Sequence, residues 1–481
     1  MEGNFDEQIK QAEDFKAKGN DHLKKNQLDL AIEAYTKAIE LNIPDKRKVA
    51  IYYANRSHTN LKMENYGFAI SDGEEAIKAD PTYAKGYYRK ASALLAIGKN
   101  KEAAAFFKKS GDDAEAKEKY SLAMKLHKEK LFSESISVDV DSAKKMLEAY
   151  NEISVSSSYI GPVFKDDEPI TAEWVISLME HMKNQKVLHK KYLWGLLFKA
   201  KEILKQHAAL VELEVPAGKE ITVCGDTHGQ YYDLLNIFKI NGNPSEENPY
   251  LFNGDFVDRG SFSVEVIVCL LAWKVYNPRC MHLTRGNHET KNMNKLYGFE
   301  GEVTSKYDGN TYDLFAEIFC HMPLVYVINS KVMVCHGGLF SKDGVKLADI
   351  KKIDHIREPP EEGLMTELLW SDPSPMNGRQ PSKRGVGVTF GPDVAHRFLD
   401  DNGLDYLIRS HEMKQNGYEE AASNRVITIF SAPNYCDQMG NKGAFIRING
   451  IDNKPKFTMF DCVEHPKIPV MAYAKNMPYM Q

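Results

Sequence analysis

Five short apolar or β-branched runs are each followed directly by side chains that could bind a metal ion. The runs are Ile221–Cys224, Tyr250–Asn253, Met281–Thr284, Val332–Cys335 and Tyr406–Arg409. The side chains that follow them are Asp226, His228, Asp255, Asn287, His336 and His411, and glycine accompanies four of the five groups. Carboxylates, imidazoles and amide oxygens are suitable ligands for divalent first-row metals, and glycines allow the tight turns that bring such ligands together. A single histidine after a strand is usually structural, but five such groups together predict a metal centre.

The pattern around these runs indicates which elements position the candidate ligands. The runs follow two segments with a helical pattern, Ile170–Lys183 and Lys190–Val211, and a sixth run lies at Val426–Phe430. Strands that alternate with helices are typical of a layered α/β fold. Functional sites in such folds gather at the carboxyl ends of the strands. We therefore expect the candidate ligands to meet at one edge of a sheet, in an enzyme.

The N-terminal part of the sequence has a different texture, rich in Ala, Lys, Glu and Tyr, and it contains internal repeats. The residues that share a register are the small Ala31, Ala69 and Ala103, the aromatic Tyr35 and Phe107, and the small Ala38 and Ala76. Small residues let paired helices approach, and the aromatic rings fill the space between them. This register resembles the tetratricopeptide repeat, whose period is 34 residues. It predicts three helical repeats, followed by a charged capping helix at Asp113–Lys130.

These textures divide the chain into four parts. We expect the three repeats and the capping helix at residues 1–130, and a Ser-rich linker around one short helical stretch at residues 131–164. We expect the catalytic domain at residues 165–465, and a C-terminal regulatory helix or tail at residues 466–481. The predicted fold class is therefore α plus α/β, an N-terminal all-α solenoid followed by an α/β sandwich.

Composition and charge exclude several classes of protein. Of the 481 residues, 43% are hydrophobic and 27% are charged, as in an ordinary soluble globular protein. The formal net charge of −5 gives no indication of a nucleic-acid partner. The cysteines are odd in number and form no CxxC pair, which favours a reducing compartment. We expect no signal peptide and no membrane span, because the longest apolar run, Val264–Trp273, is too short to cross a bilayer.

The motifs after the runs resemble the signature of the metallophosphoesterases, and more closely that of the PPP family of serine/threonine protein phosphatases. The matching motifs are GDTHGQ (225–230), GDFVDRG (254–260), GNHE (286–289), HGG (336–338) and SAPNYC (431–436). Two further blocks match, LLWSDP (368–373) and RGVGVTFG (384–391). The resemblance covers residues 165–465 and implies a metallophosphoesterase sandwich that hydrolyses phosphoserine and phosphothreonine in phosphoprotein substrates. It further implies a monomer located in the cytoplasm and the nucleus.

The resemblance implies two divalent metal ions per chain. It assigns the first ion to Asp226, His228 and Asp255, and the second to Asp255, Asn287, His336 and His411. Asp255 would bridge the two ions, which could then share a hydroxide aimed at phosphorus for in-line attack. The expected ions are Mn²⁺, iron as Fe²⁺ or Fe³⁺, or one of each, and Zn²⁺ is a further alternative. The choice stays open because similar N and O ligands suit several metals.

Four residues match the phosphate-binding positions of the family, namely Arg259, Asn287, Arg384 and Tyr435. A guanidinium fork suits a tetrahedral oxyanion better than a point charge does. Asn287 would serve both a metal ion and the substrate, and Tyr435 lies in a loop that covers the site in the family. These residues would offset the charge that builds on the phosphoryl oxygens in the transition state.

The best candidate for a general acid is His288, which is adjacent to the predicted ligand Asn287. By the resemblance, His288 would protonate the departing seryl or threonyl alkoxide. Asp258 matches the family's partner of this histidine, and it would orient the imidazole and stabilise its charged form.

Five residues of the repeats match the carboxylate clamp of tetratricopeptide domains that bind chaperone tails. They are Lys16, Asn20, Asn55, Lys85 and Arg89. Two pairs, Lys16 with Asn20 and Lys85 with Arg89, have the i, i+4 spacing that places both members on one helical face. The resemblance implies binding of the acidic C-terminal tail of heat-shock protein 90 or of its seventy-kilodalton counterpart. The alternative is a solvated basic helix face, since exposed lysines are common.

The arrangement of repeats before a phosphatase implies autoinhibition, in which the repeats cover the catalytic groove until a ligand relieves them. Glu64 matches the repeat residue that contacts the catalytic face in the family. The apolar C-terminal residues 469–481 could dock as a helix, although Pro478 would cut that helix short.

Two alternatives come from different classes. One is another metallophosphoesterase, a phosphodiesterase or nuclease, which would share the Asp, His and Asn ligands but not the arginine-containing blocks. The other is a catalytically weak or inactive adaptor that only binds chaperones. Every predicted ligand and both arginines are present, which favours the phosphatase.

Overall fold

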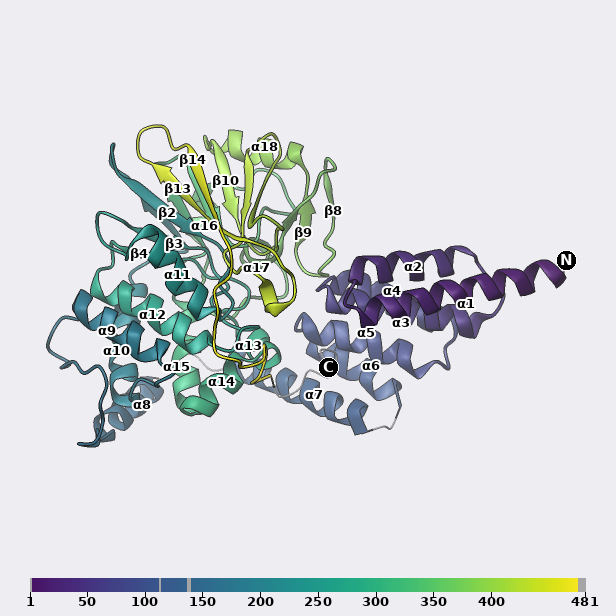
Figure 1. Cartoon of the computed structure of the whole chain (residues 1–481), viewed down its shortest axis with the longest axis horizontal. Coiled ribbons are helices and arrows are strands. Elements are labelled where there is room, and N and C mark those ends of the chain that lie inside the picture. Colours follow the sequence, from purple (N-terminus) through teal and green to yellow (C-terminus); the bar gives the residue numbers. More distant parts are fainter. Residues whose placement is uncertain (1, 112–113, 136–139, 475–481) are drawn as a thin grey trace. The chain divides into compact units, whose positions relative to one another are not determined.

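The computed structural model describes residues 2–111, 114–135 and 140–474 (Figure 1). The chain divides into two compact units. One is built on residues up to Asp139, and the short segment Pro381–Val386 is assigned to it. The other is built on Val140–Gln380 and on the described residues from Gly387 onward. Among the described residues, no helix is both long enough and apolar enough to cross a membrane.

The first unit consists of antiparallel helix pairs, as the repeats predict. Its helices are α1 (Glu2–Lys24), α2 (Leu28–Glu40), α3 (Lys46–Lys62), α4 (Tyr66–Ala79), α5 (Ala84–Ala96), α6 (Asn100–Lys109) and α7 (Ala114–Ser135). The repeated alanines Ala31, Ala69 and Ala103 are fully buried, which confirms their role at helix contacts. Gly19 shows how tight the contact is, because a Cβ atom there would lie 2.5 Å from the ring of Tyr35.

The second unit is built on two sheets and a small third one. The strands are β1 (Leu210–Leu213), β2 (Glu220–Cys224), β3 (Tyr250–Phe252), β4 (Met281–Leu283), β5 (Val325–Ile328), β6 (Val332–Cys335), β7 (Asp372–Pro373), β8 (Arg379–Pro381), β9 (Val388–Phe390), β10 (Tyr406–Arg409), β11 (Tyr418–Ala421), β12 (Val426–Ile429), β13 (Gly443–Asn449) and β14 (Pro455–Phe460). Their orders are β1-β5-β6-β10-β12-β11, β14-β13-β2-β3-β4 and β7-β9-β8. The six predicted runs are confirmed as β2, β3, β4, β6, β10 and β12.

Parallel pairing brings the carboxyl ends of these strands together. β2, β3 and β4 pair in parallel in one sheet, and β6, β10 and β12 pair in parallel in the other. The two sheets share an apolar core that includes Ile221 and Leu251 from one sheet and Tyr326 and Ile408 from the other. Both sets of strand ends can therefore contribute to one site.

Helices cover the outer face of the sheet that contains β2, β3 and β4 (Figure 1). They are α9 (Ala172–Lys183), α10 (Lys190–Leu204), α11 (Tyr231–Asn241), α12 (Ser263–Tyr276), α14 (Phe299–Lys306) and α15 (Gly309–Cys320). α12 is buried along most of its length, from Ser263 to Lys274, in the largest apolar core of the unit. This core fixes the backbone on which the loops after β2, β3 and β4 are built.

Two expectations differ from the structure. The helix predicted at Lys190–Val211 ends at Leu204, because Leu210 and the residues after it pair with β5 as strand β1. The short helix expected within the linker is present as α8 (Val140–Glu152), but its Tyr150 is buried in the core of the second unit and donates a hydrogen bond of 2.5 Å to Asp166. That unit therefore begins before residue 165.

The C-terminal residues 466–481 are predicted to form a regulatory helix or tail, and the structure describes only part of them. The described residues 466–474 contain a turn at 470–473 and no helix. Met471 has a φ of +54°, in the left-handed region, which does not continue an α-helix. Residues 475–481, including Pro478, lie outside the described part of the chain.

Candidate active site

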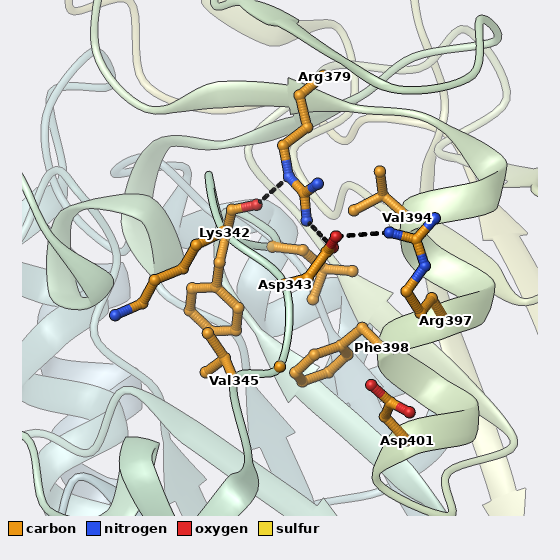
Figure 2. A pocket seen from close by; sticks show the side chains of 11 residues that line it. Lys342, Asp343, Val345, Arg379, Val394, Arg397, Phe398 and Asp401 are labelled. Carbon is orange, nitrogen blue, oxygen red and sulfur yellow. Dashed lines mark hydrogen bonds and ion pairs between the residues drawn. The ribbon is translucent and has the colours of Figure 1, made fainter.

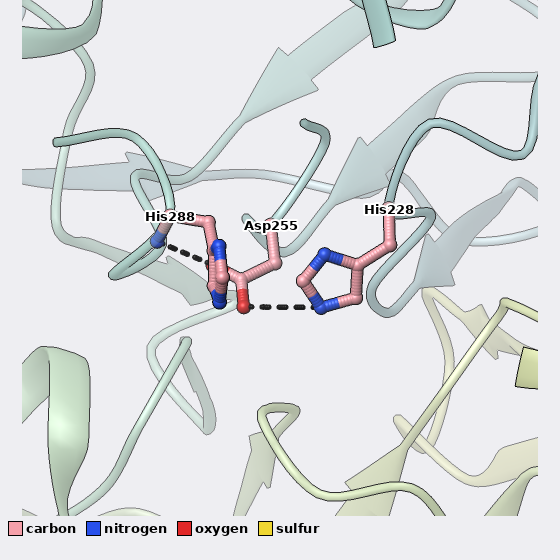
Figure 3. A group of neighbouring side chains, drawn as sticks. All are labelled: His228, Asp255 and His288. Atoms are coloured by element: carbon pink, nitrogen blue, oxygen red, sulfur yellow. Dashed lines mark hydrogen bonds and ion pairs between the residues drawn. The ribbon is translucent and has the colours of Figure 1, made fainter. Parts of the chain in front are cut away.

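The loops after β2 and β3 place an imidazole beside a carboxylate. The Nε2 atom of His228 lies 3.5 Å from Oδ2 of Asp255 (Figure 3). Asp226, from the same loop as His228, has its Oδ2 atom 3.7 Å from that Nε2. All three side chains are buried, so this group of possible ligands is shielded from bulk water.

The same carboxylate oxygen also faces the loop after β6. Oδ2 of Asp255 lies 3.3 Å from Nε2 of His336, and Oδ1 of Asn287 lies 2.9 Å from that nitrogen. The ring of His411, which follows β10, has its centroid 5.0 Å from that of His336. Asp255 therefore lies between two groups of possible ligands, one on each side of a single carboxylate.

Hydrogen bonds to backbone carbonyls set the tautomers of the two histidines that face Asp255. Nδ1–H of His228 donates to the carbonyl of Val257 at 3.0 Å, and Nδ1–H of His336 donates to that of Asn253 at 2.8 Å. A proton on Nδ1 leaves Nε2 as a lone-pair donor, which is the state in which histidine binds a metal. Both Nε2 atoms are those that approach Asp255.

The donor set fits divalent cations. With the proton on Nδ1, Nε2 of His336 and Oδ1 of Asn287 are two acceptors only 2.9 Å apart, an arrangement that a shared cation satisfies. Burial raises the pKa of Asp226 to about 7 and holds the pKa of His228 well below its ordinary value. Carboxylates without counter-charge and neutral imidazoles are what a cation requires. Ligand atoms within 4.8 Å of one another occur in two groups, His228, Asp255 and His288, and Asp255, His336 and His411.

His288 forms a dyad with Asp258, as predicted. Nδ1 of His288 lies 2.8 Å from Oδ2 of Asp258. The backbone N–H of Phe299 donates to Oδ1 of Asp258 at 2.9 Å, and the amide of Asn294 donates to its Oδ2 at 3.2 Å. These bonds fix the carboxylate, which in turn fixes the imidazole with Nε2 directed at His228 and Asp255 (Figure 3).

Two of the predicted phosphate ligands lie near this cluster. The guanidinium of Arg259 stacks 3.9 Å from the ring centroid of Tyr297, whose ring is 5.2 Å from that of His288. The ring of Tyr435 lies 5.2 Å from that of His228. Arg384 belongs to the segment Pro381–Val386, assigned to the other unit, so its place at the phosphate site remains a prediction.

The structure reveals a positioning residue that the sequence analysis did not single out, Glu289. Its carboxylate accepts hydrogen bonds from the backbone N–H groups of Asp255, Phe256 and Gly286, each at 2.8 Å. It therefore ties the loop after β3 to the loop after β4. The sequence contained a clue, because Glu289 lies in the GNHE block and has no predicted ligand role there.

Arg409 is a second positioning residue that was missed. It is fully buried and donates to the carbonyl of Gly337 at 2.7 Å and to Asp372 at 2.7 Å. It also bonds Glu412 at 3.2 Å. Gly337 follows His336 and Glu412 follows His411, so one guanidinium bonds the residue next to each of these two predicted ligands. The sequence signal for this role is the charge of Arg409 at the end of the otherwise apolar run Tyr406–Arg409.

Gly254 and Gly286 are required where two loops meet. Gly254 has a φ of +83°, and a Cβ atom there would lie 2.6 Å from the Cα of Gly286. A Cβ atom on Gly286 would lie 2.3 Å from Oδ1 of Asp255. A side chain at Gly254 would collide with the loop after β4, and a side chain at Gly286 would displace the shared carboxylate.

The predicted clamp residues of the first unit lie on α1, α3 and α5. The amide of Asn55 donates to Oδ1 of Asn20 at 3.2 Å, and the hydroxyl of Tyr35 donates to the same oxygen at 2.7 Å. The ammonium of Lys16 pairs with Glu13. The structure thus brings Asn20 and Asn55 together across two helices.

The other two clamp residues lie on α5, and Glu64 lies in a turn of the same unit. Lys85 and Arg89 lie one turn apart on α5, and the guanidinium of Arg89 lies 5.7 Å from the ring centroid of Tyr88. Glu64 lies in the turn between α3 and α4 with a φ of +62°. Its predicted contact with the catalytic face remains a prediction.

A small hollow elsewhere in the second unit lacks the features of an active site (Figure 2). Its free space is about 10 Å³, enough for about one water molecule. Asp343 crosses it and pairs with Arg379 at 2.7 Å and with Arg397 at 2.6 Å. The charges there satisfy one another, and none of the predicted site residues lines it.

Fold and site together define a class. Two packed sheets place Asp255 and the other predicted ligands at the ends of their strands. The family model described as calcineurin-like phosphoesterase matches residues 219–415, which contain these strand ends. A tetratricopeptide repeat model matches residues 18–42 and 84–110, and a model described as the PPP5 TPR repeat region matches residues 120–212.

Similar proteins extend over nearly the whole chain. Human serine/threonine-protein phosphatase 5 is 49% identical over 475 residues, which is 98% of this chain and 94% of the relative. The protein of the same name from Arabidopsis thaliana is 48% identical, with 98% of each chain covered. A solved serine/threonine phosphatase structure from Saccharomyces cerevisiae superimposes with a TM-score of 0.61 at 42% identity, covering 63% of this chain and all of that one. The chain belongs to the serine/threonine-protein phosphatase 5 family.

Proposed function

We propose that the protein removes phosphate from phosphoserine and phosphothreonine by metal-assisted hydrolysis. The observation that carries this proposal is the position of Asp255, whose Oδ2 atom lies 3.5 Å from Nε2 of His228 and 3.3 Å from Nε2 of His336. A carboxylate between two imidazoles suits a centre of two cations. Membership of the family supports the same reaction.

The predicted ligands divide around Asp255. Asp226, His228 and Asp255 would hold one divalent ion, and Asp255, Asn287, His336 and His411 would hold the other. Two bound divalent ions, Mn²⁺ or iron with Zn²⁺ as an alternative, supply Lewis acidity and lower the pKa of the attacking water. The Nδ1–H bonds to the carbonyls of Val257 and Asn253 keep the histidines in the required tautomer.

Arg259 and Arg384, with Asn287 and Tyr435, bind the phosphoryl oxygens. Three charged oxygens require donors on several sides, and guanidinium groups provide paired N–H donors in a fixed plane. The guanidinium of Arg259 stacks on the ring of Tyr297, and this contact limits the orientations that the guanidinium can take. Fixed donors stabilise the charge of the transition state without having to reorganise.

His288 donates the proton that the leaving alkoxide needs. Nδ1–H bonds Asp258 at 2.8 Å, so the opposite nitrogen, Nε2, carries the proton to be delivered when the ring is charged. Asp258 stabilises that charged ring and holds its plane. The products are then a neutral serine or threonine hydroxyl and inorganic phosphate.

The substrate class can be tested against its nearest alternatives. After chelation and return of Mn²⁺, the full chain should hydrolyse p-nitrophenyl phosphate and a phosphoserine peptide. Bis(p-nitrophenyl) phosphate should react far more slowly. Faster turnover of the diester would identify a phosphodiesterase, and loss of all turnover would favour the adaptor.

For the first unit we propose that the clamp binds the acidic C-terminal tail of heat-shock protein 90 or of its seventy-kilodalton counterpart. Asn20 and Asn55 offer amide groups from two helices, and Lys16, Lys85 and Arg89 offer positive charge. This is the donor set that a terminal carboxylate and acidic side chains need. Titration of the full chain with an acidic tail peptide, and with the same peptide amidated at its C-terminus, tests it; equal affinities would exclude a clamp.

We propose further that the repeats inhibit the phosphatase, with Glu64 as a contact residue. The support is the resemblance, and the position of Glu64 in the turn between α3 and α4 is compatible with it. Addition of the tail peptide should then raise the turnover of p-nitrophenyl phosphate by the full chain. A Glu64→Gln variant should show raised turnover without peptide, and unchanged turnover would remove Glu64 from the model.

A further inference from the structure

The described C-terminal residues run along the loop that carries Arg259. We call residues 469–473 the C-terminal strap and residues 258–261 the arginine loop. The N–H of Met471 donates to the carbonyl of Arg259 at 2.8 Å. The hydroxyl of Ser261 donates to the carbonyl of Pro469 at 2.5 Å and accepts from the N–H of Ala472 at 3.3 Å. Three hydrogen bonds therefore join the two segments.

The strap has a second attachment on α14. A Cβ atom at Gly301 would lie 2.1 Å from the carbonyl oxygen of Tyr473, so only glycine allows the strap to lie this close to the helix. The ammonium of Lys306, on the same helix, lies 5.9 Å from the ring centroid of Tyr473. α14 follows directly after Tyr297 and Gly298, so the strap joins the arginine loop to the element that begins beside the aromatic support of Arg259.

The arginine loop needs such support because its backbone is strained. Asp258 and Arg259 have φ angles of +70° and +69°, a region that non-glycine residues occupy only when surrounding contacts hold them there. The N–H of Arg259 donates to the carbonyl of Tyr297 at 3.1 Å, and its carbonyl accepts from Met471. The strap thus supplies one of the two backbone bonds of this residue.

We propose that the C-terminal strap positions Arg259 for phosphate binding. The role rests on the proposed function, in which Arg259 binds the phosphoryl group. Without the strap, the loop would relax toward ordinary φ angles and the guanidinium would leave its place over Tyr297. Metal binding would persist, because Asp255 is held separately by Glu289. The strap therefore supports phosphate binding at the active site, independently of any role of the residues that follow it.

Gly301→Ala in the full chain tests this with little other disturbance. Alanine is a better helix former than glycine, so α14 itself is not weakened, but its methyl group displaces the carbonyl of Tyr473. Gly309→Ala is the matched control, since a Cβ atom there meets nothing within 4 Å. Ser261→Ala is a second variant, which removes two of the three hydrogen bonds from the loop side.

Three readouts separate positioning from general damage. In Gly301→Ala and Ser261→Ala, amide hydrogen exchange of a peptide covering residues 256–262 should become roughly 5- to 10-fold faster. The dissociation constant for inorganic phosphate, measured by calorimetry with Mn²⁺ present, should rise about 5- to 20-fold. The Mn²⁺ concentration for half-maximal activity should stay at the wild-type value, as should all readouts of Gly309→Ala.

Exchange and phosphate affinity equal to those of Gly309→Ala would overturn the proposal, and so would tighter phosphate binding, which would make the strap an obstruction. The failure of the proposed function is a separate result: wild-type protein would then show no metal-dependent turnover. The exchange and calorimetric measurements need no turnover and still decide whether the strap holds the loop and its phosphate ligand.

Discussion

The two units position their functional side chains in opposite ways. In the catalytic unit the predicted ligands are buried, and backbone or side-chain hydrogen bonds from distant segments fix their loops, as Glu289 fixes Asp255. In the repeat unit the predicted clamp residues are half-buried or exposed and are placed mainly by the helices that carry them. Catalysis needs fixed geometry, whereas recognition of a flexible tail tolerates adjustment. Single substitutions should therefore cause abrupt losses in one unit and graded losses in the other.

The largest effect should come from the carboxylate shared by both groups of ligands. Asp255→Asn removes the negative charge between His228 and His336, and turnover of p-nitrophenyl phosphate at saturating Mn²⁺ should fall by about 10⁴-fold or more. The affinity for an acidic tail peptide should not change, because the repeats do not depend on this residue. Activity within tenfold of the wild type would contradict the assignment of Asp255 as the bridge.

Removal of the acid should produce the next largest loss, and one that depends on the leaving group. His288→Asn should slow hydrolysis of a phosphoserine peptide by roughly 10²- to 10³-fold. Hydrolysis of p-nitrophenyl phosphate should slow much less, because nitrophenolate leaves without a proton. Steady-state kinetics on both substrates give the ratio, and equal losses would make His288 a ligand or a structural residue rather than the acid.

The contrast between the units also explains how much could be predicted from the sequence. The strands that carry ligands were predictable, because buried parallel strands are short apolar runs and their ends carry the chemistry. The repeat register was predictable because Ala31, Ala69 and Ala103 must all be small. Strands β13 and β14 were not singled out: they flank β2 at the side of the sheet that bears no ligand, and their sequences carry no motif.

The missing parts of the site depend on tertiary contacts. Glu289 bonds backbone groups from residue 255, some 30 positions earlier, and spacing alone does not reveal such a partner. Arg409 is identifiable only as a charge in an apolar run, and its partners Asp372 and Glu412 follow from the fold. The strap is harder still, because its bonds to Arg259 and Ser261 use mainly backbone atoms, which every sequence has.

Arg409 allows a test of rigidity in the catalytic unit. Arg409→Met removes the buried cation that pairs with the fully buried Asp372 and with Glu412, and it should lower the free energy of unfolding by about 3 kcal/mol. Urea denaturation of the full chain, followed through the transition of the catalytic unit, measures this. Arg397→Met is the matched control, since its ion pair with Asp343 is exposed and should contribute less than about 1 kcal/mol. Equal effects would mean that burial of the network adds no stability.

The repeat unit should respond more gently. Arg89→Ala should weaken binding of an acidic tail peptide about tenfold, because one cation is lost while the other donors remain. Lys37→Ala is the control, since Lys37 pairs with Glu33 on α2 and is not part of the clamp. Calorimetry on the full chain gives both affinities. An abrupt loss of all binding in Arg89→Ala would show that the clamp is as interdependent as the metal site.

The smallest predicted effect concerns a buried charge that lies outside both sites. Lys274 on α12 is fully buried and donates to the carbonyl of Pro278 at 3.0 Å, and burial lowers its pKa to about 8. The folded state then binds fewer protons than the unfolded state between pH 8 and the ordinary lysine value near 10.5, so stability rises with pH across that window.

Lys274→Met should stabilise the catalytic unit by about 1 kcal/mol at pH 7. The difference in urea stability between variant and wild type should shrink by pH 10, because both side chains are then neutral in the folded state. A difference that is constant from pH 7 to pH 10 would mean that Lys274 stays charged inside the core, and that the catalytic unit stabilises its buried cation as effectively as it does Arg409.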